Sequence, residues 1–271
     1  MINNKLIGGL VVRWLGGWVV GLLGFSSFAF AADVPTFYGE EVVVTAIRVP
    51  HLKSTLPWNT EVITRKDIAD ANAVKLGDII RSVSGLAVKS NGGLSSQISA
   101  RMRGANSQQV LVLLDGNRIN PPSLGMFDLG DLLLADVEKI EIVKAPLSAV
   151  YGADAVGGVI NIITGKNSDV WKNSLTVNYG EFTATNLSFN SSGPQHFFSA
   201  ASIYSGGFRT NSDYKADDLN LKLSGNFGKG VLSGGIKKYS ANKGSPGSLD
   251  YLTPMARQTD SNLFFDLAYQ L

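Results

Sequence analysis

The hydrophobic and polar positions of this 271-residue chain follow two different patterns. Up to Lys166, short unbroken apolar runs such as Val110–Leu114 and Val159–Thr164 are separated by turn residues, which is typical of strands buried on both faces. After Lys166, apolar and polar residues alternate, and this periodicity indicates strands with one apolar and one polar face. The chain is therefore predicted to form a compact domain followed by a series of amphipathic strands.

The first part of the chain predicts a small α/β domain. A strand ends at Thr64, and Thr64 with Asp67 forms a capping box that opens a helix or a pair of helices. Asp115 and Gly116 follow an apolar run and are a strong signal for a hairpin turn. Lys139–Val143 is a further buried strand, so a mixed sheet with short helices is expected.

The second part of the chain predicts the wall of a transmembrane β-barrel. Short connections at 192–194 and 228–230 alternate with longer ones at 206–216 and 240–260. The apolar positions that share a face are Trp171, Leu175, Val177 and Tyr179, then Leu219, Leu221, Leu223 and Phe227, and finally Leu263, Phe265, Leu267, Tyr269 and Leu271. About six strands of roughly ten residues, apolar outside and polar inside, fit such a wall.

The amino terminus predicts export from the cytoplasm. Lys5 and Arg13 precede a run without charged residues from Trp14 to Ala32, which ends in the small-x-small pattern Ala29–Ala31. This arrangement is typical of a cleaved signal peptide. An uncleaved anchor is the alternative, because the uncharged run is also long enough to span a bilayer.

Composition and motifs exclude several kinds of site. The chain has no cysteine and two histidines, which rules out disulfides, thiolate metal sites and histidine clusters. A net charge of +2 with both signs interspersed argues against nucleic-acid binding. No catalytic constellation or cofactor motif is present, so neither an enzyme nor a bound cofactor or metal is predicted. Calcium binding at Asp213, Asp217 and Asp218 is a less favoured alternative to solvated carboxylates.

Three segments occur in a distinctive order along the chain. They are EEVVVTA at Glu40–Ala46, NGGLSSQISARMRGANSQQVLVLLDGNRIN at Asn91–Asn120 and VEKIEIVKAPLSAVYGADAVGGVINIIT at Val137–Thr164. Together they resemble the plug domain of TonB-dependent outer-membrane receptors, especially the cobalamin-receptor-like members. One departure is Ala145, which stands where the family usually has glycine and argues against a left-handed backbone there.

The resemblance implies four regions. They are a signal peptide at 1–31, a periplasmic segment at 32–50, a plug domain at 51–166 and a partial outer-membrane β-barrel at 167–271. The fold class is thus an α/β plug domain followed by the first antiparallel strands of a transmembrane β-barrel that is incomplete. The TonB box, which would pair with the TonB energy-transducing protein by β-augmentation, is Glu41, Val42, Val43, Val44, Thr45 and Ala46. An ordinary first strand of the plug is the alternative interpretation.

The resemblance also indicates binding residues. The exposed loops 91–96 and 120–127 correspond to the ligand-facing apex of the plug, with solvated loops as the alternative. The expected ligand contacts are Ser95, Ser96, Ser123, Leu124, Met126 and Phe127. Arg101 and Arg103 flank Met102 in a predicted strand, so both are expected to face the barrel wall and to pair with a carboxylate there, or else to lie on a solvated face.

The predicted function is active uptake of a large, scarce nutrient, a corrinoid or an iron chelate, across the outer membrane of a Gram-negative cell. Plugged transporters use about 22 strands, so about six strands after Lys166 predict the N-terminal part of a longer receptor. An open sheet of this size leaves unpaired backbone groups in lipid, and it is not expected to transport by itself. A passive porin or structural barrel is the alternative, and a periplasmic enzyme ranks third.

Cleavage of the signal peptide is expected after Ala31, because the small residues and the first acidic residue meet there. Mass spectrometry of the protein from the cell envelope should find a mature terminus at Ala32 or within a residue or two of it. A chain that retains Met1 would contradict this prediction and favour the anchor.

Overall fold

The computed structural model describes residues 42–43, 51–52, 58–90 and 92–271, and Glu40–Leu271 form one compact unit. Within the described residues, β1 (Val42–Val43) and β2 (His51–Leu52) form a two-stranded antiparallel sheet. The predicted signal peptide and the remaining residues of the predicted TonB box lie outside the described residues. None of the described helices is long and apolar enough to cross a membrane.

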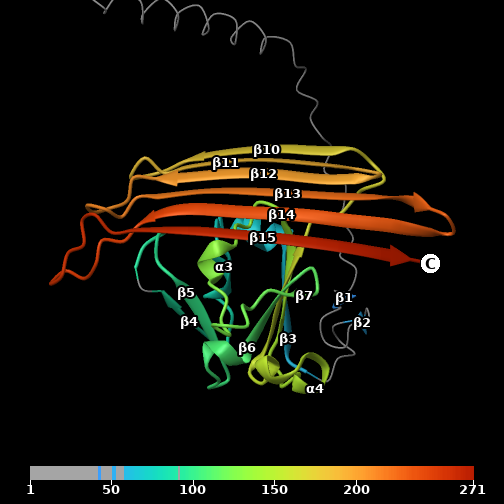
Figure 1. The fold of residues 1–271 in the computed structure, drawn as a ribbon, viewed down its shortest axis with the longest axis horizontal. Coiled ribbons are helices and arrows are strands. Elements are labelled where there is room, and N and C mark those ends of the chain that lie inside the picture. Colours follow the sequence, from blue (N-terminus) through green and yellow to red (C-terminus); the bar gives the residue numbers. More distant parts are fainter. Residues whose placement is uncertain (1–41, 44–50, 53–57, 91) are drawn as a thin grey trace, which may run out of the picture. The chain divides into compact units, whose positions relative to one another are not determined.

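A five-stranded mixed sheet is the centre of the predicted α/β domain, hereafter the plug (Figure 1). Its only parallel contact joins β6 to β9, and the other neighbours are antiparallel. Its strands, in spatial order, are β3 (Thr60–Thr64), β8 (Val137–Val143), β9 (Gly158–Thr164), β6 (Val110–Leu114) and β7 (Asn117–Arg118).

The plug sheet is covered on both faces, which explains its unbroken apolar strands. Successive residues of a strand point to opposite faces. In β6, Val112 packs in one hydrophobic cluster with Ile160, while Leu111 packs in a second cluster with Val159. Every residue of β6 and β9 is buried as a result.

Short helices and a second small sheet complete the plug. Thr64 and Asp67 form the predicted capping box at the start of α2, and Gly85 adopts a φ of 80° after the helical region, as a chain reversal requires. The α-helices are α2 (Arg65–Asp70), α3 (Leu76–Ile80) and α4 (Ser148–Tyr151), the 3₁₀ helices are η2 (Ser107–Gln109), η3 (Leu129–Asp131) and η4 (Ala153–Ala155), and the second sheet pairs β4 (Leu86–Ser90) with β5 (Ile98–Met102).

Two local backbone predictions are confirmed. Asp115 and Gly116 have φ values of 49° and 83° between β6 and β7, which is the conformation of a tight hairpin turn. Ala145 is buried and is not among the residues with positive φ. The backbone at this position is therefore not left-handed, and glycine is not required there.

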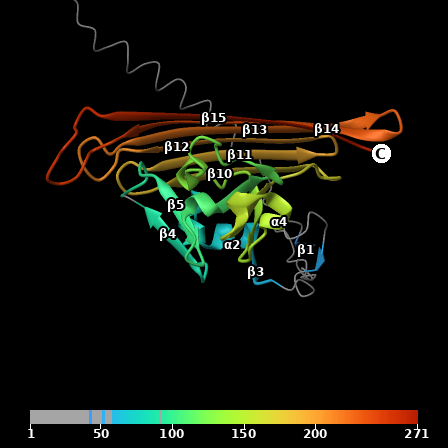
Figure 2. The ribbon, with the colours of Figure 1, turned by 60° about the horizontal axis from the view of Figure 1, so that its bottom comes forward.

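Six long antiparallel strands form one sheet in sequence order (Figures 1 and 2). The sheet is open, with β10 and β15 at its edges, and it confirms the prediction of an unclosed wall of amphipathic strands. The strands are β10 (Lys172–Tyr179), β11 (Thr185–Gly193), β12 (His196–Ser205), β13 (Tyr214–Phe227), β14 (Gly230–Gly244) and β15 (Arg257–Gln270).

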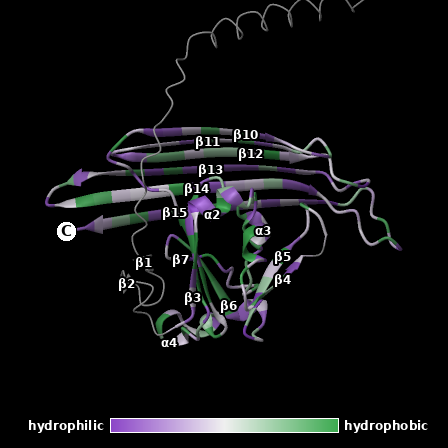
Figure 3. Ribbon diagram, turned by 180° about the vertical axis from the view of Figure 1, so that it is seen from behind, coloured by the Kyte–Doolittle hydropathy of each residue, from purple (hydrophilic) through white to green (hydrophobic). Residues whose placement is uncertain are grey.

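The two faces of this six-stranded sheet, hereafter the wall, differ in chemistry. Leu219, Leu223 and Leu263 are 45%, 54% and 66% exposed on the outward face, whereas Asn220 and Lys237 on the inward face are buried against the plug. Figure 3 shows the alternation as patches of hydrophilic and hydrophobic colour along β10–β15, beside the hydrophobic strands of the plug. The apolar face is therefore available to lipid, and the polar face is covered by the plug.

Asn120 ties β6 of the plug sheet to one of the predicted apex loops. Its Oδ1 accepts a hydrogen bond from the Val112 amide at 2.7 Å, and its Nδ2 donates to the carbonyls of Val110 and Gly125 at 3.2 and 2.9 Å. Asn120→Ala leaves buried backbone groups unsatisfied, so we expect a local loss of about 1–3 kcal/mol. Hydrogen exchange at Val112 should accelerate in this variant and stay unchanged in the exposed control Asn117→Ala; equal exchange in both would contradict the assignment.

Candidate functional site

The candidate site lies where the inward face of β12–β15 meets the plug (Figure 1). Charged and polar side chains reach this interface because inward positions alternate with outward positions along each strand. Lys237 and Lys243 project from β14 toward the plug, and their side chains are only 5% and 1% exposed. Charges with so little access to water need partners.

Lys237 bridges the plug and the wall. Its Nζ lies 2.6 Å from Oδ2 of Asp136, which precedes β8 in the plug, and 2.7 Å from Oδ1 of Asp218 on β13. The amide of Asn220 also donates to Asp136 Oδ2 at 2.7 Å. Both carboxylates are at most 1% exposed, so the ammonium group neutralises charges that water does not reach.

Lys243 repeats this arrangement nearer the longer connections. Its Nζ lies 2.7 Å from Oδ1 of Asp131 in η3 of the plug and 2.7 Å from Oδ2 of Asp260 on β15. Burial raises the pKa of Asp131 above its ordinary value, while the hydrogen bond and charge of Lys243 oppose that shift. Each of the two lysines thus shares its charge between one plug carboxylate and one wall carboxylate.

A third ion pair, between Asp115 and Lys222, follows a different arrangement. Lys222 on β13 lies 2.8 Å from Asp115 Oδ2, and the described residues provide it with no wall carboxylate. Asp115 also accepts hydrogen bonds from the amide and hydroxyl of Thr164, at 2.9 and 2.8 Å. The hairpin turn after β6 is therefore fixed both to β9 and to the wall.

Lys75 connects the start of α3 to the wall and to an apex loop. Its ammonium group lies 3.6 Å from the centroid of the Tyr214 ring and donates a hydrogen bond to the carbonyl of Leu94. Burial, followed by the charge of Lys243, lowers the pKa of Lys75 to about 7. The aromatic face and the carbonyl partly replace the water that this cation has lost.

Apolar contacts accompany the ionic ones. Leu133 of the plug packs in one hydrophobic cluster with Ala201, Ile203 and Tyr214 of the wall. Phe127 faces Phe264 of β15, with ring centroids 6.5 Å apart. The ion pairs therefore lie beside packed apolar groups that keep water away.

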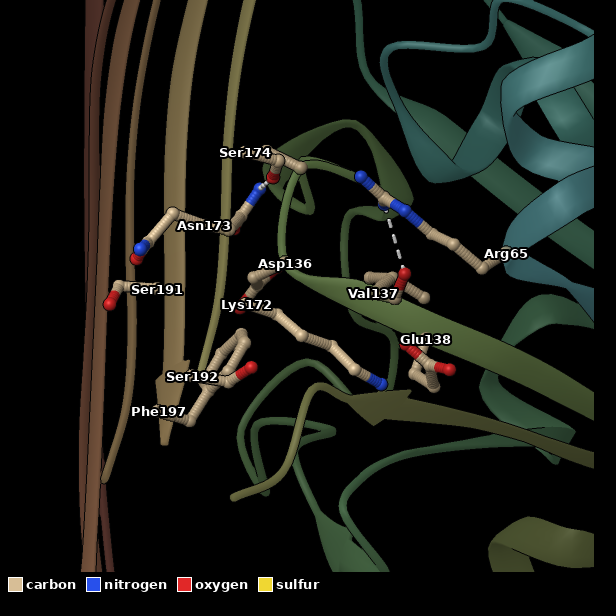
Figure 4. Close-up of a pocket in the computed structure, with 12 residues that line it drawn as sticks. Arg65, Asp136, Val137, Glu138, Lys172, Asn173, Ser174, Ser191, Ser192 and Phe197 are labelled. Carbon is tan, nitrogen blue, oxygen red and sulfur yellow. Dashed lines mark hydrogen bonds between the residues drawn. The ribbon is translucent and has the colours of Figure 1, made fainter. Parts of the chain in front are cut away.

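A cavity of about 270 Å³ separates the plug from β10–β12 (Figure 4). Arg65 lies on its plug side and donates hydrogen bonds to the carbonyls of Leu134 and Val137, at 2.7 and 3.0 Å. Lys172, Ser174 and Ser192 line the opposite side from β10 and β11. Charged and polar residues outnumber apolar ones around it, so the cavity can hold water.

The predicted apex loops lie near the longer connections of the wall. The ring of Phe208, in the connection between β12 and β13, leaves no room for a side chain at Gly93. Ser96 donates to the Gly93 carbonyl at 2.8 Å and lies 2.9 Å from the Ser90 hydroxyl, so its hydroxyl group stabilises its own loop. Ser95 is half-buried in the same loop.

The second apex loop agrees only in part with the expected exposure. Ser123 and Leu124 are exposed, the latter to 66%, and Met126 is half-buried. The expectation that Phe127 is exposed is wrong, because its side chain is 5% exposed and belongs to the plug core. A large apolar ring beside the Phe264 ring is more stable buried than in a solvated loop. The proposed ligand contacts themselves remain predictions.

The predicted strand geometry of the two arginines is corrected. β5 ends at Met102, and Arg103 adopts a φ of 54° beyond it, so Arg101 and Arg103 do not occupy equivalent positions of one strand. Arg103 donates to the Lys144 carbonyl at 2.8 Å within the plug, and both arginines are exposed. The described ion pairs with the wall have the opposite polarity to that expected, with carboxylates on the plug and lysines on the wall.

The three carboxylates considered for calcium have separate partners. Asp213 forms an ion pair with Arg257, whose hydrogen bonds hold the pKa of Asp213 below its usual value. Asp217 accepts from the Ser202 hydroxyl on the outward face, and Asp218 pairs with Lys237 on the inward face. Among the described residues, no group of three metal-ligating side chains is found.

Asp131, Asp136, Lys237 and Lys243 were not singled out from the sequence. The alternation within β14 contained part of the signal, because Lys237 and Lys243 both fall on the polar face of that strand. Their partners could not be inferred, since Asp136 and Lys237 are 101 residues apart in the chain.

Known proteins resemble both parts of the chain. Residues 53–159 match the family model described as the TonB-dependent Receptor Plug Domain. The vitamin B12 transporter BtuB of Vibrio vulnificus (strain YJ016) is 34% identical over 198 residues, which cover 71% of this chain and 32% of that protein. The chain therefore spans about a third of the length of this relative.

Solved structures share the fold at lower identity. The alcaligin outer-membrane receptor FauA from Bordetella pertussis has a TM-score of 0.68 and 17% identity, covering 84% of this chain and 38% of its own. The pyoverdine receptor FpvA from Pseudomonas aeruginosa PAO1 has a TM-score of 0.66 and 18% identity, covering 74% and 30%. At these identities the likeness establishes the fold, a plug domain followed by antiparallel strands.

Removing the charge of Lys237 should destabilise the contact between plug and wall more than altering Asp136, the plug residue with which Lys237 pairs. Lys237→Met leaves the buried carboxylates of Asp136 and Asp218 uncompensated, with an expected cost of about 3–5 kcal/mol. Asp136→Asn leaves Lys237 paired with Asp218 and should cost about 1 kcal/mol. Hydrogen exchange of β8 measures both effects.

The neighbouring residue Lys238 provides a matched control, because it lies on the outward face and does not contact the plug. Lys238→Met should leave exchange in β8 unchanged. If Lys237→Met and Lys238→Met had the same effect, the ionic attachment would be wrong.

Proposed function

This chain belongs to the TonB-dependent receptors, and we propose that it provides the plug and the first wall strands of a receptor that takes up a large, scarce nutrient across the outer membrane. The wall would lie in the outer membrane with its apolar face toward lipid, after export directed by residues 1–31. Uptake would require a complete barrel around the plug. The ligand would be bound and moved without a chemical reaction.

The observation that carries this proposal is the sharing of Lys237 and Lys243 between plug and wall. A plug that must move to admit a ligand has to leave the wall without exposing unpaired charges to a dry interface. When the plug shifts, Lys237 keeps Asp218 and Lys243 keeps Asp260. Removing a buried partner outright costs about 3–5 kcal/mol, and the shared pairs reduce this cost on the wall side.

The plug carboxylates released by such a movement would enter water. Asp131 and Asp136 would then be hydrated, which compensates a carboxylate for a lost partner. The interface would be stable at rest and separable under force. The polar cavity beside β10–β12 supports this mechanism, because it leaves space for water at the plug surface around the start of β8.

The ligand class is a corrinoid or a ferric siderophore. The relative described as a vitamin B12 transporter supports the first, and the receptors described with pyoverdine and alcaligin support the second. Ligand contacts at Ser95, Ser96, Ser123, Leu124 and Met126 would combine hydroxyl groups with apolar surface, as amphipathic ligands require. The exposed Leu124 is the strongest apolar candidate among them.

Energy would enter through the segment Glu41–Ala46. Its β-branched residues favour an extended backbone, and Val42–Val43 adopt a strand paired with His51–Leu52. The periplasmic domain of the TonB protein would pair with the edge of this segment by β-augmentation. Because the chain continues from this segment into the plug, a force applied to the segment would act on the plug.

Val43→Pro tests the proposal because proline removes the amide that main-chain pairing uses. In a full-length receptor carrying this region, the variant should lose uptake and capture by the periplasmic domain of TonB, while ligand binding at the cell surface stays normal. Phe37→Pro, outside the segment, is the control and should retain both. Normal uptake by Val43→Pro would show that this segment does not couple energy.

A further inference from the structure

The outward face of the wall contains a groove of about 470 Å³, within the usual range of ligand sites. Its floor is Ala200 on β12, a small residue between the larger side chains of Phe189 on β11 and Leu219 on β13. Leu175 and Leu187 extend the apolar side of the groove toward β10. Ala200 is half-buried and the four larger side chains are exposed on the outward face, so no part of the plug fills the space.

The strand register gives the groove one apolar end and one polar end. Leu175, Phe189, Ala200, Leu219 and Lys238 are aligned across five strands, and Lys238 is the only charged residue in that row. The next row toward the longer connections continues from Leu187 through Ser202 and Asp217 to Ser240. The groove therefore leads from branched aliphatic groups to an ammonium group and hydroxyl groups.

The charge at the polar end favours an anion. Neither Lys238 nor the exposed Lys215 has an ion-pair partner within the described part of the chain. Asp217 is the opposing charge at this end, and the Ser202 hydroxyl donates to it at 2.7 Å. Two lysines against one carboxylate leave a net positive rim. An ammonium group at the edge of an apolar surface typically extends toward the membrane interface.

From this arrangement we infer a binding site for a phosphate-bearing lipid, with an acyl chain in the groove over Ala200 and the phosphate at Lys238. The inference rests on the proposed function, because it requires the outward face to lie in a membrane. A division into apolar tail and anionic head matches the two ends of the groove. The β14 side of the groove would hold the phosphate, and the acyl chain would extend toward β10.

A second copy of the chain fits the same surface less well. Stable protein interfaces bury about 1,200–2,000 Å² in total, and they avoid unpaired lysines at their centre. Lys238 lies within the groove and would be buried by a second copy, whose outward carboxylate from this surface, Asp217, is already held by the Ser202 hydroxyl. A lipid phosphate supplies that anion directly.

Native mass spectrometry of a full-length receptor carrying this region, purified in dodecyl maltoside, tests the site by counting retained lipids. Phosphatidylglycerol should be retained by the unaltered protein, and diacylglycerol with the same acyl chains should not. Lys238→Gln should weaken retention about fivefold, the effect of one lysine near an anionic headgroup. Lys238→Arg should preserve retention, and Ala200→Leu, which fills the floor, should abolish it.

Two matched controls separate the groove from general effects of charge and size. Lys229→Gln removes an exposed lysine from the turn between β13 and β14, and Gly225→Leu adds an apolar side chain to an outward position with nothing nearby. Both variants should retain phosphatidylglycerol like the unaltered chain. The inference would be overturned if Lys238→Gln and Lys229→Gln lost equal amounts of phosphatidylglycerol, or if the unaltered protein retained diacylglycerol as well as phosphatidylglycerol. It would also be overturned if the protein were a dimer that Ala200→Leu dissociates.

Membrane insertion is scored separately, in the full-length receptor carrying this region, as protection of β10–β15 from protease in phosphatidylcholine vesicles. If β10–β15 of the unaltered receptor stay unprotected, the membrane placement in the proposed function fails. Protection together with unchanged lipid retention in Lys238→Gln and Ala200→Leu contradicts the lipid site alone. Variants that stay protected are folded, so their lipid retention reports on the groove.

Discussion

Two ammonium groups on the inward face of the wall, those of Lys237 and Lys243, define how the plug and the wall meet. Each is almost without solvent and is held by carboxylates from both sides of the interface. Because a buried charge is stable only when paired, the plug must present Asp136 and Asp131 at the matching positions along β14. This requirement fixes the position of the plug along the strands more tightly than apolar packing alone, which tolerates sliding.

The same constraint explains the chemistry of the two faces of the wall. Inward positions carry the lysines, aspartates and asparagines that the plug satisfies, and outward positions carry leucines and phenylalanines. Since adjacent residues on a strand point in opposite directions, Lys237 and Lys238 serve different surroundings although they are neighbours in sequence. One is neutralised by the plug, and the other lies at the edge of an apolar groove on the opposite face.

The interface combines packed contacts with spaces that water can fill. Ion pairs, the Lys75–Tyr214 contact and the ring pair Phe127–Phe264 hold the plug along β13–β15, and Leu133 packs against Ala201 and Ile203 of β12. Cavities of about 270 and 240 Å³ remain between the plug and β10–β12 and between the plug and β13–β15. Polar side chains line both cavities, so water can enter the interface beside the packed groups.

Local features of this protein were determined by the sequence itself. The unbroken apolar runs became the buried strands β6, β8 and β9, the alternating residues became six amphipathic strands, and the Thr64–Asp67 capping box and the turn at Asp115 formed as expected. These features depend on residues close together in the chain, where periodicity and turn chemistry act.

Only the tertiary structure decided which polar groups meet. The pairing of Asp136 with Lys237 joins residues 101 positions apart, the burial of Phe127 depends on Phe264 of β15, and the groove over Ala200 requires five strands in one register. Arg103 likewise turned toward a plug carbonyl because β5 ends one residue earlier. A strand pattern specifies the face of each side chain but not the partner opposite it, which is set by the register and docking of distant segments.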